Sequence, residues 1–520
     1  MSTITEAGVR PTAADDRSFF GHPRGLSTLF FTEMWERFSF YGIRPLLILF
    51  MTAAITSGGF GFDRPTAGAI VGIYASSVYL SSLPGGWVAD RLLGLRRAIM
   101  LGAVLISAGH ISIGLSSFAY SKAPFFVGLI LIVLGTGLLK PNISAIVGDL
   151  YPEGGARRDA GFSIFYMGIN TGATGGFLAT GLLGEKVGWH WGFGIAGVGM
   201  LLGLAWFALR AGPTLGDLGL QISRHPDPVK QARQQRLMIL GLALGLGALA
   251  LVVILAATGT ITLNPVSLGE KMVYVLVATA VLYFGILFLV GGLTREEKKR
   301  LVVIAVLFVF ASIFWSAFEQ APTSLNLFAR DFTDRQLGGF QIPAGLFQSI
   351  NALFIIIFAP VFAWIWSALA KRGLDLSSPT KFSLGLFVTA VAFFVMLVAA
   401  NIVVASNGTV KVSPWWLVGC YLLQTAGELS ISPVGLSSMT KLSPRRYVGQ
   451  MMGVWFLATS LGNLIAGLVG GNVNPQDLAQ TPKLFTLTAA SLLVAGVVLA
   501  ALIVPIRNMM ARQTDASAAV

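Results

Sequence analysis

Long apolar stretches separated by short polar segments recur along the chain from residue 27 to residue 508. A helix of about 20 residues crosses the roughly 30 Å hydrocarbon core of a bilayer, so each stretch is long enough to span it. The sequence lacks the short segments of alternating polar and apolar residues that are typical of outer-membrane barrels. The pattern therefore predicts about fourteen membrane-spanning helices, near residues 27–55, 66–89, 98–118, 123–147, 159–183, 190–210, 236–258, 270–292, 301–330, 341–370, 382–405, 414–440, 447–471 and 484–507.

The composition excludes a soluble protein. Residues of the AVILMFWYC set make up 55% of the chain and charged residues only 11%, whereas a soluble domain carries about 25% charged residues. The net charge of +13 could suggest a nucleic-acid partner, but in a membrane protein Lys and Arg gather in cytoplasmic loops. Most of the 36 Lys and Arg residues fall on one side of the predicted topology. We therefore expect a multi-pass protein of the cell (inner) membrane, with both termini cytoplasmic and no nucleic-acid partner.

The first 26 residues are polar and lack the apolar core of a signal peptide, so we expect no cleaved signal. Cys420 is the single cysteine, which excludes an intrachain disulfide.

The longest polar stretch between spans, 211–235, is followed by two spans, and the remaining spans divide into six and six. The predicted organisation is a cytoplasmic N-tail (1–26), an N-terminal six-helix bundle (27–211), a linker with two extra helices of structural role (212–293), a C-terminal six-helix bundle (294–508) and a cytoplasmic C-tail (509–520). Loop 86–97, GWVADRLLGLRR, resembles the loop between the second and third spans of the major facilitator superfamily, although it could also be a generic basic loop. Transporters of this architecture bind substrate near the midplane, between two bundles.

The first span holds four ionisable residues: Glu33, Glu36, Arg37 and Arg44. Such a residue at a helix centre costs about 2.5–3.5 kcal/mol on insertion scales and implies a partner or a wet cavity. At about 100° per residue the four share one stripe with Phe40 and Tyr41, so the stripe must face the protein interior. Glu33 and Arg37 stand at the i,i+4 spacing that allows them to pair.

Three further charges lie inside spans. They are Lys140 in the fourth core span, Glu319 in the segment FWSAFEQ of the seventh, and Glu428 in the tenth. With every group ionised, four carboxylates face three cations. That imbalance suits one exchangeable proton or the ammonium group of a ligand. A purely structural set of ion pairs, with Glu428 at a helix kink near Pro433, is the alternative.

Polar and aromatic residues accompany these charges: Tyr79, Asn170, Trp315, Gln320, Asn326, Gln348, Asn351, Trp455 and Asn463. Singly, each could serve helix packing. Together they fit a ligand rich in amides, because backbone amides pair with Asn and Gln and variable side chains need adaptable aromatic walls. Cations of the first half and Glu428 of the second would hold opposite ends of a zwitterion. His110, in the third span, is either a packed, hydrogen-bonded histidine or a proton relay.

Five segments resemble the proton-dependent oligopeptide transporter (POT/PTR) family, a branch of the major facilitator superfamily. They are EMWERFSFYG at 33–42, FYMGINTG at 165–172, FWSAFEQAPTSLNLFA at 314–329, QSINALFIIIFAPVFAWIW at 348–366, and GELSISPVGLSSMTKLSP at 427–444 followed by GVWFLATSLGN at 453–463. The resemblance implies an all-α polytopic membrane protein with the major facilitator fold, two six-helix bundles and two extra helices between them.

The resemblance also implies roles for individual residues. The proton-coupling group would comprise Glu33, Glu36, Arg37, Lys140 and Glu319. The peptide-binding residues would be Tyr41, Arg44, Tyr79, Lys140 and Asn170 for the carboxylate and backbone, Asn351 and Glu428 for the amino terminus, and Trp315 and Trp455 for the side chains. Phe40 departs from the family pattern, which has a tyrosine there, and Ala352 stands where members often have proline.

The expected function is that of a proton-coupled symporter importing di- and tripeptides by alternating access. Its partners would be peptide, H⁺ and the lipid bilayer, and it would act as a monomer without cofactor or metal. We do not expect an enzyme, because the sequence shows no nucleotide-binding loop, metal-ligand cluster or nucleophile–base constellation. The alternatives are a proton-coupled carrier of another small anion or drug-like solute with the same fold, and a channel or non-transporting membrane receptor.

Overall fold

The computed structural model describes residues 16–116, 122–222, 227–374 and 376–511, and nearly all of them are helical. The helices are Arg24–Thr52 (α1), Ile55–Ser57 (η1), Arg64–Val88 (α2), Ala89–Leu93 (η2), Leu95–Ser116 (α3), Ala123–Asp149 (α4), Gly155–Lys186 (α5), Trp189–Leu215 (α6), Pro228–Ala257 (α7), Pro265–Val290 (α8), Arg295–Phe318 (α9), Ala321–Leu325 (η3), Asn326–Phe332 (α10), Ala344–Phe347 (η4), Gln348–Lys371 (α11), Ser378–Ala405 (α12), Trp415–Leu442 (α13), Arg445–Tyr447 (η5), Val448–Gly470 (α14) and Gln480–Ala511 (α15). The strands Gln336–Leu337 (β1) and Phe340–Gln341 (β2) form one small antiparallel hairpin.

Each predicted span coincides with one long helix or with consecutive helical segments, and the last two residues of the span predicted at 98–118 lie outside the described residues. The span predicted at 301–330 is made of α9, the π-helical turn η3 and α10, and the span predicted at 341–370 begins with the short helix η4. The predicted tails 1–26 and 509–520 lie partly outside the described residues. Helix starts follow local capping rules: Asp63 accepts a hydrogen bond from the amide of Thr66, and Thr294 and Glu297 form a capping box at α9.

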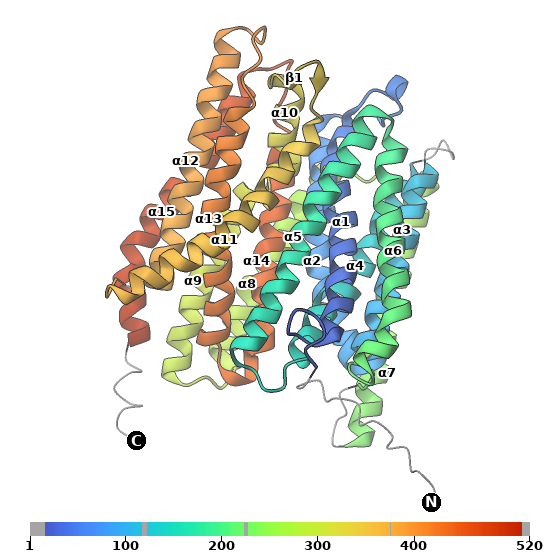
Figure 1. Cartoon of the computed structure of the whole chain (residues 1–520), viewed down its shortest axis with the longest axis vertical. Coiled ribbons are helices and arrows are strands. Elements are labelled where there is room, and N and C mark those ends of the chain that lie inside the picture. The colour runs from blue at the N-terminus through green and yellow to red at the C-terminus, as the bar shows by residue number, and fades with distance from the viewer. Residues whose placement is uncertain (1–15, 117–121, 223–226, 375, 512–520) are drawn as a thin grey trace, which may run out of the picture.

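The long helices form two bundles that stand side by side (Figure 1). In the first, α1 packs against α5 and α6, α3 against α4 and α6, and α2 against α4. In the second, α12 packs against α13 and α15, while α9 packs against α14 and α15. The main contacts between the bundles are those of α2 with α14 and of α5 with α11. The start of α1 and the end of α15 lie at the same end of the molecule, opposite β1 and α10 (Figure 1).

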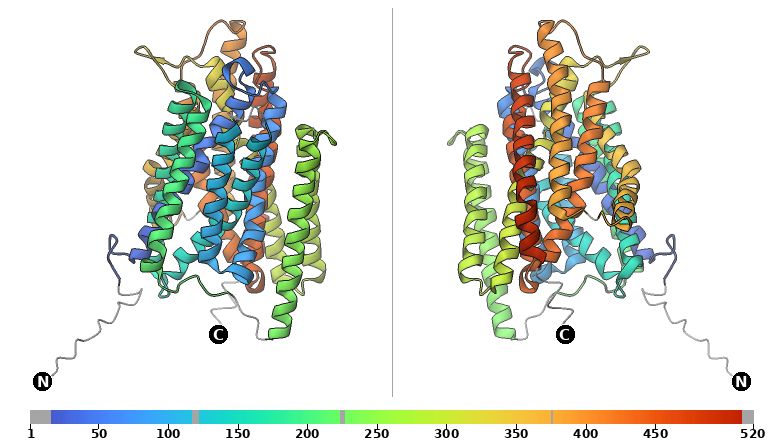
Figure 2. Two further views of the ribbon diagram at one scale, coloured as in Figure 1. Left: turned by 90° about the vertical axis from the view of Figure 1, so that its right-hand side faces the viewer. Right: turned by 90° about the vertical axis from the view of Figure 1, so that its left-hand side faces the viewer.

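Helices α7 and α8 stand beside the two bundles (Figure 2). α8 packs against α2 and α14, whereas Met238 is the one residue of α7 that is buried. Their side chains are strongly apolar yet mostly exposed on the molecule. Such an apolar surface is suited to contact with lipid, and the pair lies beside the helices that form the two bundles.

Eleven of the described helical segments are long and apolar enough to cross a membrane by composition alone. α1, α5 and α13 do not meet that criterion, although they are as long as the others and lie inside the bundles. These three helices carry Glu33, Glu36, Arg37, Arg44, Asn170 and Glu428. The least lipid-compatible helices therefore carry the charged stripe of α1 and part of the rest of the predicted site.

Glycines let the bundles touch where α2 crosses α14. A Cβ on Gly72 would lie 2.9 Å from the Cα of Gly467 and 2.9 Å from the carbonyl oxygen of Leu464, and both of these atoms are backbone. Backbone cannot move aside as a flexible side chain can, so this crossing depends on small residues.

Replacing Gly72 by valine is expected to cost about 1–3 kcal/mol of stability, because the added methyl groups force the two helices apart. The measurement is thermal unfolding in detergent, followed by size-exclusion chromatography. Gly285 of α8 provides the control, because a Cβ there meets nothing within 4 Å. Equal melting temperatures for G72V and G285V would contradict the close crossing.

Candidate functional site

The charged stripe of α1 faces the interior, as predicted. The residues Glu33, Glu36, Arg37, Phe40 and Arg44 are all buried, with Glu36 at 0% exposure and Arg44 at 6%. Tyr41 is half-buried on the same side of the helix. The stripe is thus held by protein contacts over more than two turns rather than by lipid.

Arg37 forms the centre of a triad. Its Nε lies 2.9 Å from Oε1 of Glu33 and 2.5 Å from Oε2 of Glu36. All three side chains are at most 3% exposed. The guanidinium also lies over the ring of Phe40, with 5.2 Å from Cζ to the centroid. Two carboxylates on one guanidinium leave the triad one unit negative when all three groups are ionised.

Lys140 of α4 is the other cation near this triad. It interacts electrostatically with Arg37, Glu36 and Glu33. Among the described residues it makes no ion pair, and its Nζ lies instead over the ring of Tyr79, 4.1 Å from the centroid. The ammonium group is therefore placed by a cation–π contact and remains available to a carboxylate.

Arg44 joins the two bundles. Its Nη2 lies 2.5 Å from Oε2 of Glu319 and donates a hydrogen bond of 3.3 Å to Oδ1 of Asn463. The side chains of the ion pair are 7% and 6% exposed. Glu319 stands where the regular helix α9 ends and the π-helical turn η3 begins, an irregularity that is frequent at functional sites.

The opposite side of the site is built by α11 and α13. Asn351 donates hydrogen bonds to Oγ1 of Thr425 at 2.9 Å and to Oε2 of Glu428 at 3.4 Å. Glu428 is half-buried and interacts electrostatically with Glu319, although no cation forms an ion pair with it within the described parts of the chain. Tyr41 interacts with the groups on both sides, including Arg44, Glu319 and Glu428. The predicted charges of the two bundles thus meet in one region.

The remaining predicted residues are more enclosed. Asn170 is 5% exposed, and its side-chain amide donates to the carbonyl oxygen of Tyr166 at 3.0 Å. Trp315 and Trp455 are 8% and 5% exposed. Trp455 packs edge-on against Phe382, and its ring lies directly on Gly435 of α13. Both indoles are therefore packed walls rather than freely exposed surfaces.

Two tyrosines of the site were not singled out from the sequence. Tyr166 is 44% exposed and interacts electrostatically with Glu428 and Tyr41. Tyr74 of α2 is 4% exposed, interacts with Arg44 and Glu36, and its hydroxyl has no hydrogen-bond partner in the part of the chain that the structure describes. The signal for Tyr166 was its position one turn before Asn170.

His110 is packed, at 1% exposure, next to Gly197 of α6. The hydrogen bond expected for a packed histidine is not found: both ring nitrogens lack a partner within the described ranges.

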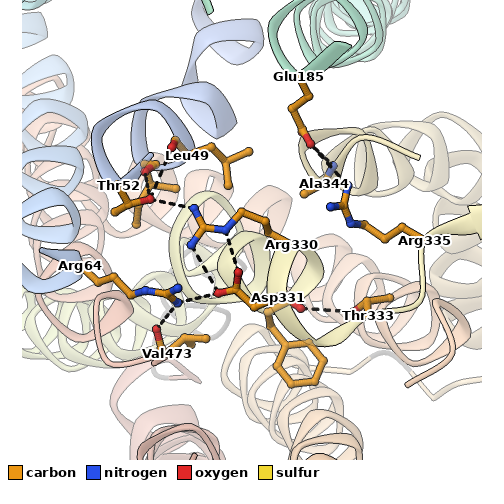
Figure 3. A network of polar contacts seen from close by, with 12 residues as sticks. Leu49, Thr52, Arg64, Glu185, Arg330, Asp331, Thr333, Arg335, Ala344 and Val473 are labelled. Carbon is orange, nitrogen blue, oxygen red and sulfur yellow. Dashed lines mark hydrogen bonds and ion pairs between the residues drawn. The ribbon is translucent and has the colours of Figure 1, made fainter. Parts of the chain in front are cut away.

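The molecule is closed by polar contacts at the end where β1 and α10 lie (Figure 3). Nη1 of Arg64 lies 2.7 Å from Oδ2 of Asp331 and donates to the carbonyl oxygen of Val473 at 2.6 Å. Arg330 donates to Oγ1 of Thr52 at 2.9 Å and pairs with Asp331. Each contact except the last joins the first bundle to the second, so polar contacts hold the two bundles together at this end.

Comparison with known proteins agrees with this architecture. A family model described as the POT family matches residues 96–484. Peptide transporter YePEPT of Yersinia enterocolitica is 51% identical over 494 residues, covering 95% of this chain and 96% of that protein. A di-/tripeptide transporter of Lactococcus lactis subsp. lactis is 38% identical over 513 residues, covering 95% of this chain and 98% of that protein. The crystal structure of a peptide transporter POT in complex with sulfate superposes with a TM-score of 0.86 at 40% identity, covering 96% of this chain and 98% of that one. The chain is therefore a member of the POT family of membrane transporters.

Proposed function

We propose that this chain is a proton-coupled symporter that imports di- and tripeptides by alternating access and works as a monomer. The observation that carries the proposal is the buried ion pair between Arg44 and Glu319, which joins the two bundles beside Glu428. The relatives from Yersinia and Lactococcus are named as peptide and di-/tripeptide transporters, which supports the peptide substrate. The membrane would be the cell (inner) membrane, with both termini cytoplasmic.

The geometry supports a simple coupling step. An ionised Glu319 forms an ion pair with the guanidinium of Arg44, and protonation of Glu319 breaks this ion pair. The freed Arg44 and the ammonium of Lys140 then bind the peptide carboxylate, while Glu428, oriented by Asn351, binds the peptide ammonium. Loss of the proton to the cytoplasm restores the ion pair and expels the carboxylate.

The polar contacts at the end with β1 and α10 support a proposal for the side of the membrane to which the site is closed. The contacts around Arg64 and Asp331 lie at the end away from the start of α1 and the end of α15. With cytoplasmic termini, that end would be external, and its contacts support an outward-closed arrangement of the two bundles. The bundles predicted at 27–211 and 294–508 would rock about the site, and the linker and extra helices at 212–293 would stay beside them.

One proton is sufficient to drive accumulation. A charge that crosses 100 mV gains about 2.3 kcal/mol, and each pH unit adds about 1.4 kcal/mol. A zwitterionic peptide adds no net charge, so the sum corresponds to accumulation on the order of a hundredfold.

The test is uptake of labelled dialanine into proteoliposomes that contain only this protein. We expect saturable uptake, driven above the external concentration by an inward proton gradient and competed by unlabelled dialanine. Preloaded dialanine should also exchange without a gradient, which a channel or a receptor would not show. Gradient-independent uptake, or competition by small anions but not by dipeptides, would contradict the proposal.

Replacing Glu428 by glutamine is expected to weaken dialanine binding by about 10–100-fold, because a charge-assisted hydrogen bond to the ammonium is worth about 1.5–3 kcal/mol. N-acetyl-dialanine, which lacks the ammonium, is the matched ligand and should bind the two proteins alike. The measurement is competition against labelled peptide in counterflow. Equal losses for both ligands would show that Glu428 does not recognise the amine.

A further inference from the structure

Glu185, near the end of α5 in the first bundle, binds the backbone of the second bundle through both carboxylate oxygens (Figure 3). The amide of Ala344 donates to Oε2 at 2.9 Å, and the amide of Gly345 donates to Oε1 at 2.9 Å. The side chain of Glu185 is 13% exposed. No motif or spacing singles out this residue, which is the last acidic residue before a short loop.

The two amides open a helix. Residues Ala344–Lys371 form one helical stretch, in which η4 continues directly into α11. The first amides of a helix have no partner within it, and a carboxylate at that end is favoured by the helix dipole. The residue before the stretch is Pro343, which provides no side-chain hydrogen bond to cap the helix. The cap comes from the other bundle.

Neighbouring contacts hold Glu185 in register with the helix start. Nη1 of Arg335 lies 3.4 Å from Oε2 of Glu185 and donates to the carbonyl oxygen of Ile342 at 2.6 Å. Burial lowers the pKa of Arg335, and the carboxylate of Glu185 opposes that shift. One turn before Glu185, Gly181 faces Leu346, with 2.8 Å between its Cβ position and Cδ1. The two helices thus touch along a full turn.

We propose that Glu185 is a removable cap of the α11 helix, which favours the outward-closed state and positions Asn351 for the peptide amine. When the bundles part at this end, both amides lose the carboxylate and the first turn of the helix loses its anchor. Asn351 lies less than two turns further along the same helix, where it donates to Glu428. Glu185 does not touch the site and acts through α11. This role in peptide recognition rests on the proposed function, whereas the capping role does not.

The capping role is tested by distance measurements between spin labels at positions 55 and 410, with Cys420 replaced by serine. Ile55 and Val410 are 76% and 52% exposed and flank the closed end from opposite bundles. We expect E185A to raise the ratio of open to closed populations about tenfold, as expected for the loss of a charged cap. E185Q is isosteric and keeps one acceptor oxygen, so it should raise the ratio of open to closed populations by less. It replaces E185A in the test if E185A does not fold.

Glu270 of α8 is the matched control, because it is acidic, exposed and near the same end. E270A should leave the distance distribution unchanged. Unchanged distances in both Glu185 variants would overturn the cap, whether or not the protein transports peptide.

The positioning role is tested by the ratio of affinities for dialanine and N-acetyl-dialanine. E185A should lower this ratio at least threefold, because Asn351 no longer orients Glu428 toward the ammonium. An unchanged ratio, together with shifted label distances, would overturn the positioning role and leave the cap intact.

Discussion

Replacing Glu319 by glutamine is expected to abolish accumulation of peptide while peptide exchange continues. Glutamine keeps the size of the side chain and cannot ionise, so Arg44 is permanently released for the peptide carboxylate. Without a group that gains and loses the proton, the gradient no longer drives the cycle. Uptake of labelled dialanine should fall from on the order of a hundredfold accumulation to equilibration with the medium, at an unchanged or faster counterflow rate.

The control for Glu319 is Glu270, an exposed carboxylate of α8, whose replacement by glutamine should leave both rates unchanged. Concentrative uptake by E319Q equal to that of the wild type would reject Glu319 as the coupling acid. Loss of counterflow as well as accumulation would show instead that the ionised ion pair is needed for peptide binding.

Replacing Arg37 by methionine is expected to destabilise the protein by about 3–5 kcal/mol, because it leaves buried carboxylates without their partner. Glu33 and Glu36 are at most 3% exposed and cannot recover their hydration in place. The apparent melting temperature in detergent should fall by about 5–10 °C. Dialanine accumulation should be lost as well.

A second variant separates stability from function at this triad. Combining R37M with E33Q and E36Q removes all three charges and keeps the side-chain volumes, so most of the lost stability should return. Dialanine accumulation should not return, because the proposed proton-coupling group is gone. A single R37M variant as stable as the wild type would show that the triad is not a buried ion network in the membrane.

The sequence was sufficient to predict the helices, because lipid imposes a length and an apolar surface on every span. It did not predict the π-helical turn at Ala321–Leu325, although Pro322 lies within it, because a proline alone does not determine which irregularity relieves the lost hydrogen bond. The burial of the charged stripe on α1 was also predictable, since no membrane helix can present such residues to hydrocarbon.

The interaction partners of the charged residues were harder to predict than the burial of these residues. Periodicity indicated that Arg44 needed a partner, but no local pattern identified Glu319, which lies 275 residues further along the chain. Lys140 was predicted near both the carboxylates and Tyr79, but the sequence did not indicate that its ammonium group lies over the ring of Tyr79. Glu185 was missed because a charged residue at a helix end is usually solvated, and its partners are backbone amides, which leave no trace in a sequence.

The ion pair between Arg44 and Glu319 also has a consequence for biogenesis, because 275 residues separate the two. A ribosome adds about 5–20 residues per second, so Arg44 is synthesised roughly 15–55 s before its partner. The ion pairs of Arg37 with Glu33 and Glu36 lie within a single helix and can form as soon as that helix forms. The guanidinium of Arg44 must be sheltered by the insertion machinery or by water at the membrane surface until α9 arrives. The first helix can therefore reach its final position only after the second half of the chain has been inserted.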